Sequence, residues 1–366
     1  MTEHSWLNIL RSKFPTITEA AYLYPIFVNR KLLKTKYNLE FRIFTELNVN
    51  VYDCDYLMIT SKYSKYNNLW SEKKEIYSFL ENISSKVNCV IWADLTDGSG
   101  TTQFGVLPYV DLYFKGCLLK NKMNYKNRYY GSRIYADYYH NKYGINDVDS
   151  GEDHLNVIPN ENDFNKIKLS WNYSLFNHTY IGHYYMKLRR FIEYLPYMYV
   201  NNFTTPFRKR DIILNSNFNV IYSRKTIEFQ RTMISKLLQD KYPVINTNKY
   251  EYFNNLKKSK VVLSPFGWGE LTLRDYETII AGAALLKPDC SHLITWPNIF
   301  QSNAYYLFKW DFSDLVDLID SFEYRMDEIA NLANNAQTLM KDYLLKEWGN
   351  IKFSERFISL ITQKNN

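Results

Sequence analysis

Residues 260–288 read KVVLSPFGWGELTLRDYETIIAGAALLKP, and their pattern indicates the fold class most clearly. It opens with an apolar run typical of a buried strand and passes through a glycine-containing loop. It continues with helical apolar spacing and ends in a second apolar run, closed by Lys287 and Pro288. A strand, a helix and another strand in this order predict a unit of a parallel sheet wrapped by helices. In such sheets ligands bind beyond the carboxyl ends of the strands, where this glycine loop would lie.

The rest of the chain repeats the alternation of short apolar runs and helical segments. In the C-terminal half we expect strands at 211–214, 242–245 and 305–308 and helices at 226–238, 250–258, 314–325 and 328–345. In the N-terminal half we expect strands at 56–60 and 89–92, a helix at 75–83, and further strand candidates at 106–112 and 134–139. The pattern predicts an α/β fold of two Rossmann-like domains whose parallel sheets face a central cleft. We expect the domains to span 1–205 and 206–345, with a C-terminal helix at 346–366 that could return to the first domain.

The composition fits a folded, two-domain protein. The 366 residues are 46% hydrophobic and 23% charged, which excludes disordered and low-complexity classes. No apolar run approaches the roughly 20 residues of a membrane-spanning helix, and residues 1–15 lack the apolar core of a signal peptide. The four cysteines are widely spaced, without a CxxC pair, so we expect neither a zinc site nor a disulfide framework. We therefore expect a cytoplasmic protein, with peripheral contact to the inner face of the membrane as one option.

Charge and glycine are both unevenly distributed. Half of the 12 glycines fall within 98–105 and 267–282, one window in each half of the chain. Residues 115–143 carry seven basic side chains against one acid, Asp137, together with seven tyrosines. Such a stretch could bind nucleic acid, an anionic membrane or a phosphorylated acceptor. It could equally be a solvated face of the protein.

The second glycine window has the character of a phosphate-binding loop. Gly267 and Gly269 permit a ligand to approach the backbone closely, and the helix after them offers the positive end of its dipole to a diphosphate. Arg274 and Glu277 share one face near the start of this helix. An arginine there can bind phosphate, and a carboxylate can accept both ribose hydroxyls. The alternative is a surface salt-bridged turn.

Several motifs resemble a known family. The segments SPFGWGE at 264–270, RDYE at 274–277 and AGA at 281–283 resemble the donor half of GT-B-fold glycosyltransferases. The chain is most similar to group-1-like glycosyltransferases of bacterial surface-polysaccharide clusters. The likeness continues through KPD, SH and WPN at 287–289, 291–292 and 296–298. It covers most of the chain, but the motif identity is strong only over 260–300 and 90–145.

This resemblance implies transfer of a sugar from a nucleotide-diphosphate donor bound by the C-terminal domain, with the acceptor on the N-terminal domain. Glu277 matches the glutamate that binds the ribose in the family. Glu270 lies near the family's other glutamate, which acts toward the donor sugar, but the two are seven residues apart here and not eight. Trp268 belongs to the same donor loop. Upstream, phosphate contacts are implied for Tyr222, Arg224 and Arg231, with a structural ion pair as the alternative for Arg231.

The first glycine window lies in the acidic, hydroxyl-rich stretch 91–101, which would face the acceptor. Asp94 or Asp97 could be the general base if the reaction inverts the anomeric centre. An Asp-Gly turn that caps the next element is the alternative. His140 is a second base candidate, and Lys115 and Arg133 are further candidates for phosphate contact.

We expect no metal cofactor, and the nucleotide sugar itself serves as co-substrate. The patterns Asp53-Cys54-Asp55 and Asp147-Val148-Asp149 look like the metal-binding DxD motif of another glycosyltransferase fold, but neither follows an apolar strand. His178 and His183 have no nearby carboxylate or cysteine in the sequence, so they do not predict a zinc site.

The leading interpretation is a glycosyltransferase of polysaccharide biosynthesis that acts on a saccharide, glycolipid or other hydroxyl acceptor. One alternative is a nucleotide-sugar epimerase of the same fold. Another is a nucleic-acid-binding or base-glycosylating protein that uses residues 115–143. The donor sugar, the acceptor and the stereochemical outcome stay open.

Overall fold

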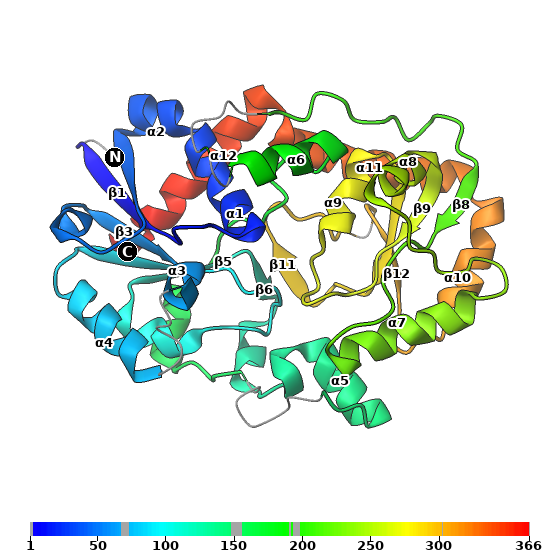
Figure 1. Cartoon of the computed structure of the whole chain (residues 1–366), viewed down its shortest axis with the longest axis horizontal. Coiled ribbons are helices and arrows are strands. Elements are labelled where there is room, and N and C mark those ends of the chain that lie inside the picture. Colours follow the sequence, from blue (N-terminus) through cyan, green and yellow to red (C-terminus); the bar gives the residue numbers. More distant parts are fainter. Residues whose placement is uncertain are drawn as a thin grey trace.

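The computed structural model consists of two α/β halves that lie side by side (Figure 1). It describes residues 3–66, 73–147, 156–189, 192, 198–301 and 303–365. The predicted fold class, two halves with parallel sheets flanked by helices, is confirmed.

The N-terminal half is built on a six-stranded sheet in the order β2-β1-β3-β4-β5-β7, with all neighbours parallel. Its strands are β1 (Ser5–Leu10), β2 (Leu39–Phe44), β3 (Tyr56–Thr60), β4 (Cys89–Asp94), β5 (Leu112–Lys115) and β7 (Ile167–Leu169). Successive side chains point to opposite faces of a strand. Accordingly, Met58 and Ile91 belong to the apolar cluster that also holds side chains of residues 17–37 and 353–361, whereas Leu57 and Trp92 belong to the cluster that holds side chains of residues 76–83.

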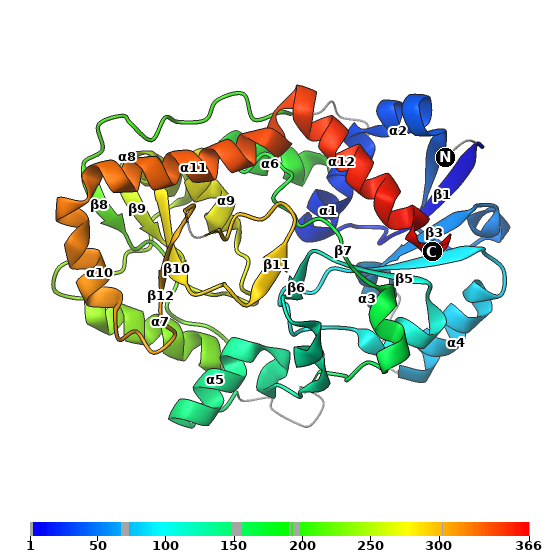
Figure 2. The ribbon, with the colours of Figure 1, turned by 180° about the vertical axis from the view of Figure 1, so that it is seen from behind.

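The helices of this half are α1 (Ile17–Val28), α2 (Arg30–Tyr37), α3 (Ser61–Tyr66), α4 (Lys73–Ser84), α5 (Ile134–Tyr143) and α6 (Tyr180–Arg189). Helices α1 and α2 pack on one face of the sheet and α4 packs on the other, whereas α5 lies against the C-terminal half. The last long helix of the chain, α12 (Lys346–Ile361), also packs here, because Phe353 and Phe357 join the same cluster as Met58. Figure 2 shows α12 running from the C-terminal half back across the N-terminal sheet.

The C-terminal half has a four-stranded parallel sheet in the order β12-β10-β9-β8. Its strands are β8 (Ile212–Asn215), β9 (Ser259–Leu263), β10 (Ala284–Pro288) and β12 (Tyr306–Phe308). Its helices are α7 (Lys225–Leu238), α8 (Lys249–Lys258), α9 (Leu273–Ile280), α10 (Leu315–Ser321) and α11 (Met326–Leu344). In Figure 1, α7 lies on one side of this sheet and α8, α9 and α11 lie on the other.

A small antiparallel ladder joins the two halves. Strand β6 (Cys117–Leu119) from the N-terminal half pairs with β11 (Leu293–Thr295) from the C-terminal half. Helix α5 packs on α7 across the same junction. The relative position of the halves is therefore fixed by backbone hydrogen bonds as well as by side-chain packing.

Three sequence-based expectations about secondary structure are wrong. The strand expected at 242–245 is reduced to a single bridge between Ile245 and Asn217, since Pro243 has no N–H to donate. Residues 134–139 belong to helix α5, and the apolar run at 106–112 mostly forms a 3-10 helix, Phe104–Tyr109, before β5 begins.

Candidate functional site

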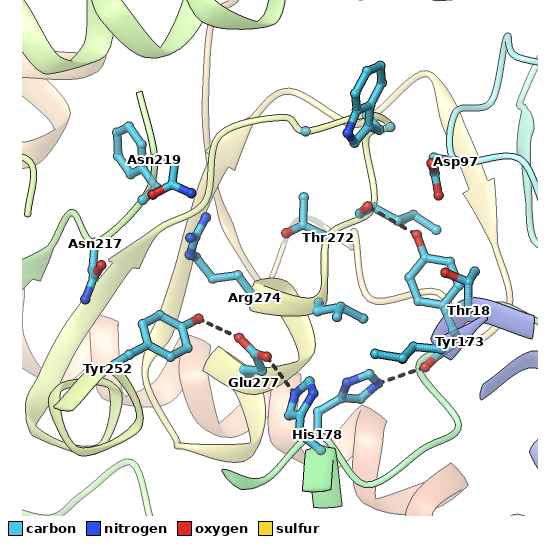
Figure 3. Close-up of a pocket in the computed structure, with 18 of the residues that line it drawn as sticks. Thr18, Asp97, Tyr173, His178, Asn217, Asn219, Tyr252, Thr272, Arg274 and Glu277 are labelled. Atoms are coloured by element: carbon cyan, nitrogen blue, oxygen red, sulfur yellow. Dashed lines mark hydrogen bonds and ion pairs between the residues drawn. The ribbon is translucent and has the colours of Figure 1, made fainter. Parts of the chain in front are cut away.

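A pocket of about 640 Å³ opens between the halves, beyond the carboxyl ends of β8 and β9. Its C-terminal wall comes from the loops after these strands and from α8 and α9, and the N-terminal half adds the first turn of α1 and the loop after β4. Figure 3 shows Arg274, Glu277 and Tyr252 on one side of the pocket and Asp97 and Thr18 on the other. This is the place where the topology of an open α/β sheet positions a ligand.

Glu277 is a buried carboxylate in the wall of this pocket. The Tyr252 hydroxyl donates a hydrogen bond to its Oε2 at 2.5 Å, and Nε2 of His183 lies 2.8 Å from its Oε1. Burial alone would raise the pKa of Glu277, but the hydrogen bond and charge of His183 and the Tyr252 hydroxyl outweigh it, so the pKa is lowered. The side chain is therefore held as a carboxylate in one orientation.

His178 supports this arrangement as a neutral ring. Its Nε2 donates to the Tyr173 carbonyl at 2.8 Å, and the ring stacks on Tyr276 with 5.1 Å between centroids. Burial, and secondarily the charge of His183, lowers the pKa of His178 to about 3. From the sequence, His178 and His183 were candidates only for a metal site. Their link to Glu277 could not be predicted, because each histidine is at least 94 positions away from Glu277 and no local pattern relates them.

Two arginines line the pocket without a carboxylate partner among the described residues. Arg231 is 4% exposed, and its guanidinium donates to the carbonyls of Phe266 and Asn219 while lying 4.4 Å from the centre of the Tyr222 ring. Arg274 has a buried Nε without a hydrogen-bond partner. Within the described part of the chain, neither guanidinium forms an ion pair with a carboxylate. An arginine without an acidic partner in a pocket is suited to bind phosphate.

Most of the predicted donor residues are gathered at this pocket. Tyr222, Gly267, Trp268, Gly269, Arg274 and Glu277 all line it. Arg224 does not line it, because its guanidinium lies 3.5 Å from Asp147 and 5.5 Å from the Trp268 ring. Asp147 also accepts hydrogen bonds from the backbone N–H and hydroxyl of Thr226, so it caps the start of α7 from the other half. Thr272 and Asp275 form a capping box at the start of α9.

Glu270 lies outside the pocket and is fully buried at the junction of the halves. It accepts hydrogen bonds from the Ser99 hydroxyl at 2.6 Å and from the Ser99 N–H at 3.0 Å, and His292 Nε2 lies 3.7 Å away. Burial opposes ionisation, but His292 and Ser99 together lower the pKa of Glu270 to about 2. In this arrangement Glu270 is separated from the pocket and from Glu277.

The two glycine windows meet at this junction. A Cβ placed on Gly269 would lie 1.8 Å from the Asp97 carbonyl oxygen, so only glycine permits the two loops to touch. A Cβ on Gly98 would lie 3.6 Å from Glu270 Oε2. Gly267 is different, since its nearest neighbours would be 3.7 Å away. The sequence pattern thus reflects a contact between the halves as well as a loop for a ligand.

The acceptor-side candidates differ in their surroundings. Asp94 is buried in an ion pair with Lys115 at 3.1 Å and also accepts a hydrogen bond from the Tyr113 hydroxyl. It lines a separate small cavity of about 20 Å³. Asp97 lines the large pocket. His140 lies on α5, stacked on Tyr130 at 3.8 Å, and does not line the pocket.

The basic, tyrosine-rich stretch does not form one exposed basic surface. Lys115 and Arg133 are buried, and Arg133 donates to the backbone carbonyls of Trp268 and Gly131. Lys126 and Lys142 form ion pairs with carboxylates. Three of the seven tyrosines of this stretch, Tyr125, Tyr135 and Tyr139, are fully buried, whereas Tyr143 is exposed.

The described residues contain no cluster of three or more His, Cys, Asp or Glu side chains arranged to hold a metal ion. In the first DxD pattern, Asp53 pairs with Arg42 and Asp55 accepts from the Trp6 N–H. Asp149 of the second pattern lies outside the described residues. No helix in the described ranges has the length and apolar character needed to cross a membrane.

Comparisons with known proteins found similarity at the level of structure. No protein-family model matches the chain, and no curated protein matches it significantly.

A glycosyltransferase from Rickettsia africae is 9% identical with a TM-score of 0.46 over the whole of both chains. HepE from Anabaena, solved in complex with UDP-glucose, is 9% identical with a TM-score of 0.44 over 97% of this chain and 99% of its own. An alpha-glucosyltransferase solved with UDP-glucose and DNA containing an abasic site is 11% identical with a TM-score of 0.39, over 98% and 100%. All three TM-scores are below 0.5.

Proposed function

We propose that the protein is a glycosyltransferase that moves a sugar from a nucleotide-diphosphate sugar to a hydroxyl group of an acceptor. The observation that carries this proposal is the pairing of Glu277 with Arg231 and Arg274 in one pocket. A fixed carboxylate can accept both hydroxyls of a ribose, and arginines without acidic partners can bind the diphosphate next to it. In a nucleoside diphosphate the ribose is bonded directly to the diphosphate, so the carboxylate and the arginines can bind these two neighbouring groups.

In this proposal the residues of the pocket have separate roles. The acceptor oxygen attacks the anomeric carbon of the donor, and the bond from that carbon to the diphosphate oxygen breaks. The electron pair leaves on the diphosphate, whose developing charge Arg231 and Arg274 stabilise. Asp97, across the pocket from Arg274, is the candidate to take the acceptor proton if the reaction inverts. This chemistry needs no metal ion or further cofactor from the protein.

Under the same proposal, residues 206–345 bind the nucleotide sugar and residues 1–205 bind the acceptor, with 346–366 returning to the first domain. The position of the pocket between two halves suits the exclusion of water that a transferase needs. We propose a saccharide or glycolipid acceptor, and hence a role in polysaccharide biosynthesis.

We also propose a cytoplasmic location with peripheral contact to an anionic membrane. None of the four cysteines, all of which lie in the described ranges, forms a disulfide, which fits a reducing compartment. On α6, Ile181, Tyr184 and Leu188 are exposed on one face, and Lys187 and Lys249 lie within 6 Å of the Tyr184 ring. Apolar side chains flanked by lysines suit the surface of an anionic bilayer. Sedimentation with phosphatidylglycerol vesicles, compared with phosphatidylcholine vesicles, tests this contact.

The experiment for the proposed activity is a donor screen. UDP, GDP, ADP and CMP sugars are incubated with the protein, with and without a mixture of saccharide acceptors, and release of the nucleotide is measured. We expect one donor to release its nucleotide faster when acceptor is added, and Glu277→Gln to abolish this release. Conversion of the donor sugar to an isomer without nucleotide release would indicate an epimerase and contradict the proposal.

A further inference from the structure

A second pocket, of about 340 Å³, lies at the opposite end of the C-terminal sheet. It is formed by the segment that enters β8, by the beginning of β9 and by the first turns of α11. It shares no lining residue with the 640 Å³ pocket. It is therefore separate from the site to which the proposed function refers.

The charge in this second pocket is strongly unbalanced. Arg208, Lys209, Arg210 and Lys260 line it, together with a single acid, Asp327. Arg208 and Lys209 are exposed, and within the described ranges neither they nor Lys260 form an ion pair with a carboxylate. The ammonium group of Lys260 contacts the Met326 sulfur at 3.0 Å, and a thioether is only a weak acceptor.

Arg210 forms the buried part of this basic cluster. It is 6% exposed, and its two terminal nitrogens donate to backbone carbonyls, including those of Ser259 and Ala281, both at 2.8 Å. Its Nε is buried without a hydrogen-bond partner. Burial, together with the positive charge of Arg208, lowers the pKa of Arg210 to about 10. A buried guanidinium surrounded only by carbonyls keeps a positive charge that no acidic side chain neutralises.

The backbone around the pocket also favours a negatively charged ligand. The first turn of α11 lines the pocket, and no side chain caps the start of this helix. The positive end of its dipole adds to the four cationic side chains, and Asp327 and Glu328 in its first turn offset part of this contribution.

We propose that this second pocket binds a small phosphate-bearing anion. The anion would be held by Arg208, Lys209 and Lys260 at the rim, above the buried charge of Arg210. The pocket is larger than inorganic phosphate requires, so a pyrophosphate or a phosphate ester fits as well. This site goes beyond the proposed function and does not depend on it.

The test is isothermal titration of inorganic pyrophosphate into the full-length protein at low salt, in the presence of saturating UDP to occupy the first pocket. The double variant Arg208→Ala/Lys209→Ala removes exposed side chains that no described residue pairs with, so it should fold normally. We expect it to bind pyrophosphate on the order of tenfold more weakly, or worse, and Lys260→Met to behave similarly. A matched control, Lys31→Ala/Lys236→Ala, removes the same charge from exposed positions elsewhere and should stay within about twofold of the original protein.

The outcomes separate this site from the proposed activity. Pyrophosphate binding that is unchanged in Arg208→Ala/Lys209→Ala, or that weakens equally in the control, overturns the second site. If UDP does not bind but pyrophosphate binding still depends on Arg208 and Lys209, the proposed function fails and the second site stands. If Lys260→Met fails to fold, the exposed double variant alone decides.

Discussion

The carboxylate of Glu270 accepts a hydrogen bond from the hydroxyl of Ser99 at 2.6 Å, although 171 positions separate the two residues. The Ser99 N–H donates to the same carboxylate, and both partners are fully buried. This contact fastens the loop after β4, which carries Asp97, to the loop before α9, which leads to Glu277. Glu270 is therefore a positioning residue in this arrangement of the halves, and its predicted role toward the donor sugar stays a prediction.

Because its pKa is depressed to about 2, Glu270 should stabilise the fold in a pH-dependent way. A depressed carboxyl pKa contributes stability that is complete above the unfolded value, about 4.3, and is lost as the pH falls toward 2. We expect Glu270→Gln to lower the free energy of unfolding by roughly 2–3 kcal/mol at pH 6, and the difference from the original protein to shrink between pH 4.3 and 2. Urea unfolding at several pH values measures this, and a difference that does not change with pH would contradict it.

Gly269 and Gly267 offer a matched pair of substitutions in one loop. Gly269→Ala would place a methyl group 1.8 Å from the Asp97 carbonyl oxygen, whereas Gly267→Ala meets its nearest atoms at 3.7 Å. We expect Gly269→Ala to destabilise the protein by about 1–3 kcal/mol and Gly267→Ala to cost less than about 1 kcal/mol. Thermal unfolding of both variants tests the contact between the glycine windows. Equal losses of stability in the two variants would mean that the close approach of Gly269 to Asp97 does not restrict this position to glycine.

Asp97 is the acceptor-side carboxylate that lines the large pocket. If it accepts the proton of the acceptor, Asp97→Asn should lower kcat by a factor of about 10²–10⁴ and leave nucleotide affinity unchanged. The measurement is a steady-state assay with the donor found in the screen, beside a nucleotide titration of the same variant. A variant that retains full kcat would exclude Asp97 as the base.

Asp94 should respond differently, because it is buried against Lys115. Asp94→Asn leaves the Lys115 ammonium buried without its counter-charge, which costs about 3–5 kcal/mol. We expect the double variant Asp94→Asn/Lys115→Met to recover a large part of this loss in urea unfolding. If Lys115→Met does not rescue Asp94→Asn, the ion pair is not what stabilises this loop.

The sequence predicted the C-terminal half well because its elements are regular and local. The run from β9 through α9 to β10 has apolar strands, a capping box between Thr272 and Asp275 and a loop with scarce glycines, and each of these signals is contained within a few residues. In the N-terminal half, β1 was missed although it lies inside the sheet between β2 and β3. Its segment SWLNIL interrupts the apolar run with Asn8, whose buried side chain is satisfied by the carbonyls of Asn50 and Val51, far along the chain.

Only part of the site could be predicted from the sequence. Local motifs identified Gly267, Arg274 and Glu277, but the partners that hold Glu277, namely Tyr252 and His183, come from α8 and α6. The sequence shows both glycine windows but does not predict that they touch. Contacts between the halves depend on the relative position of two sheets and leave no local pattern in the sequence.

The central claim is that Glu277, held by His183 and Tyr252, binds the ribose of a nucleoside diphosphate. Isothermal titration of UDP, GDP, ADP and CMP into the protein tests it most directly, with Glu277→Gln as the variant and Glu251→Gln, an exposed glutamate of α8, as the control. We predict that UDP, GDP or ADP binds more tightly than the monophosphate CMP, that Glu277→Gln weakens this binding by at least about tenfold, and that the control stays within about twofold. Absence of binding by all three diphosphates, or equal affinity of Glu277→Gln and the original protein, would contradict the account.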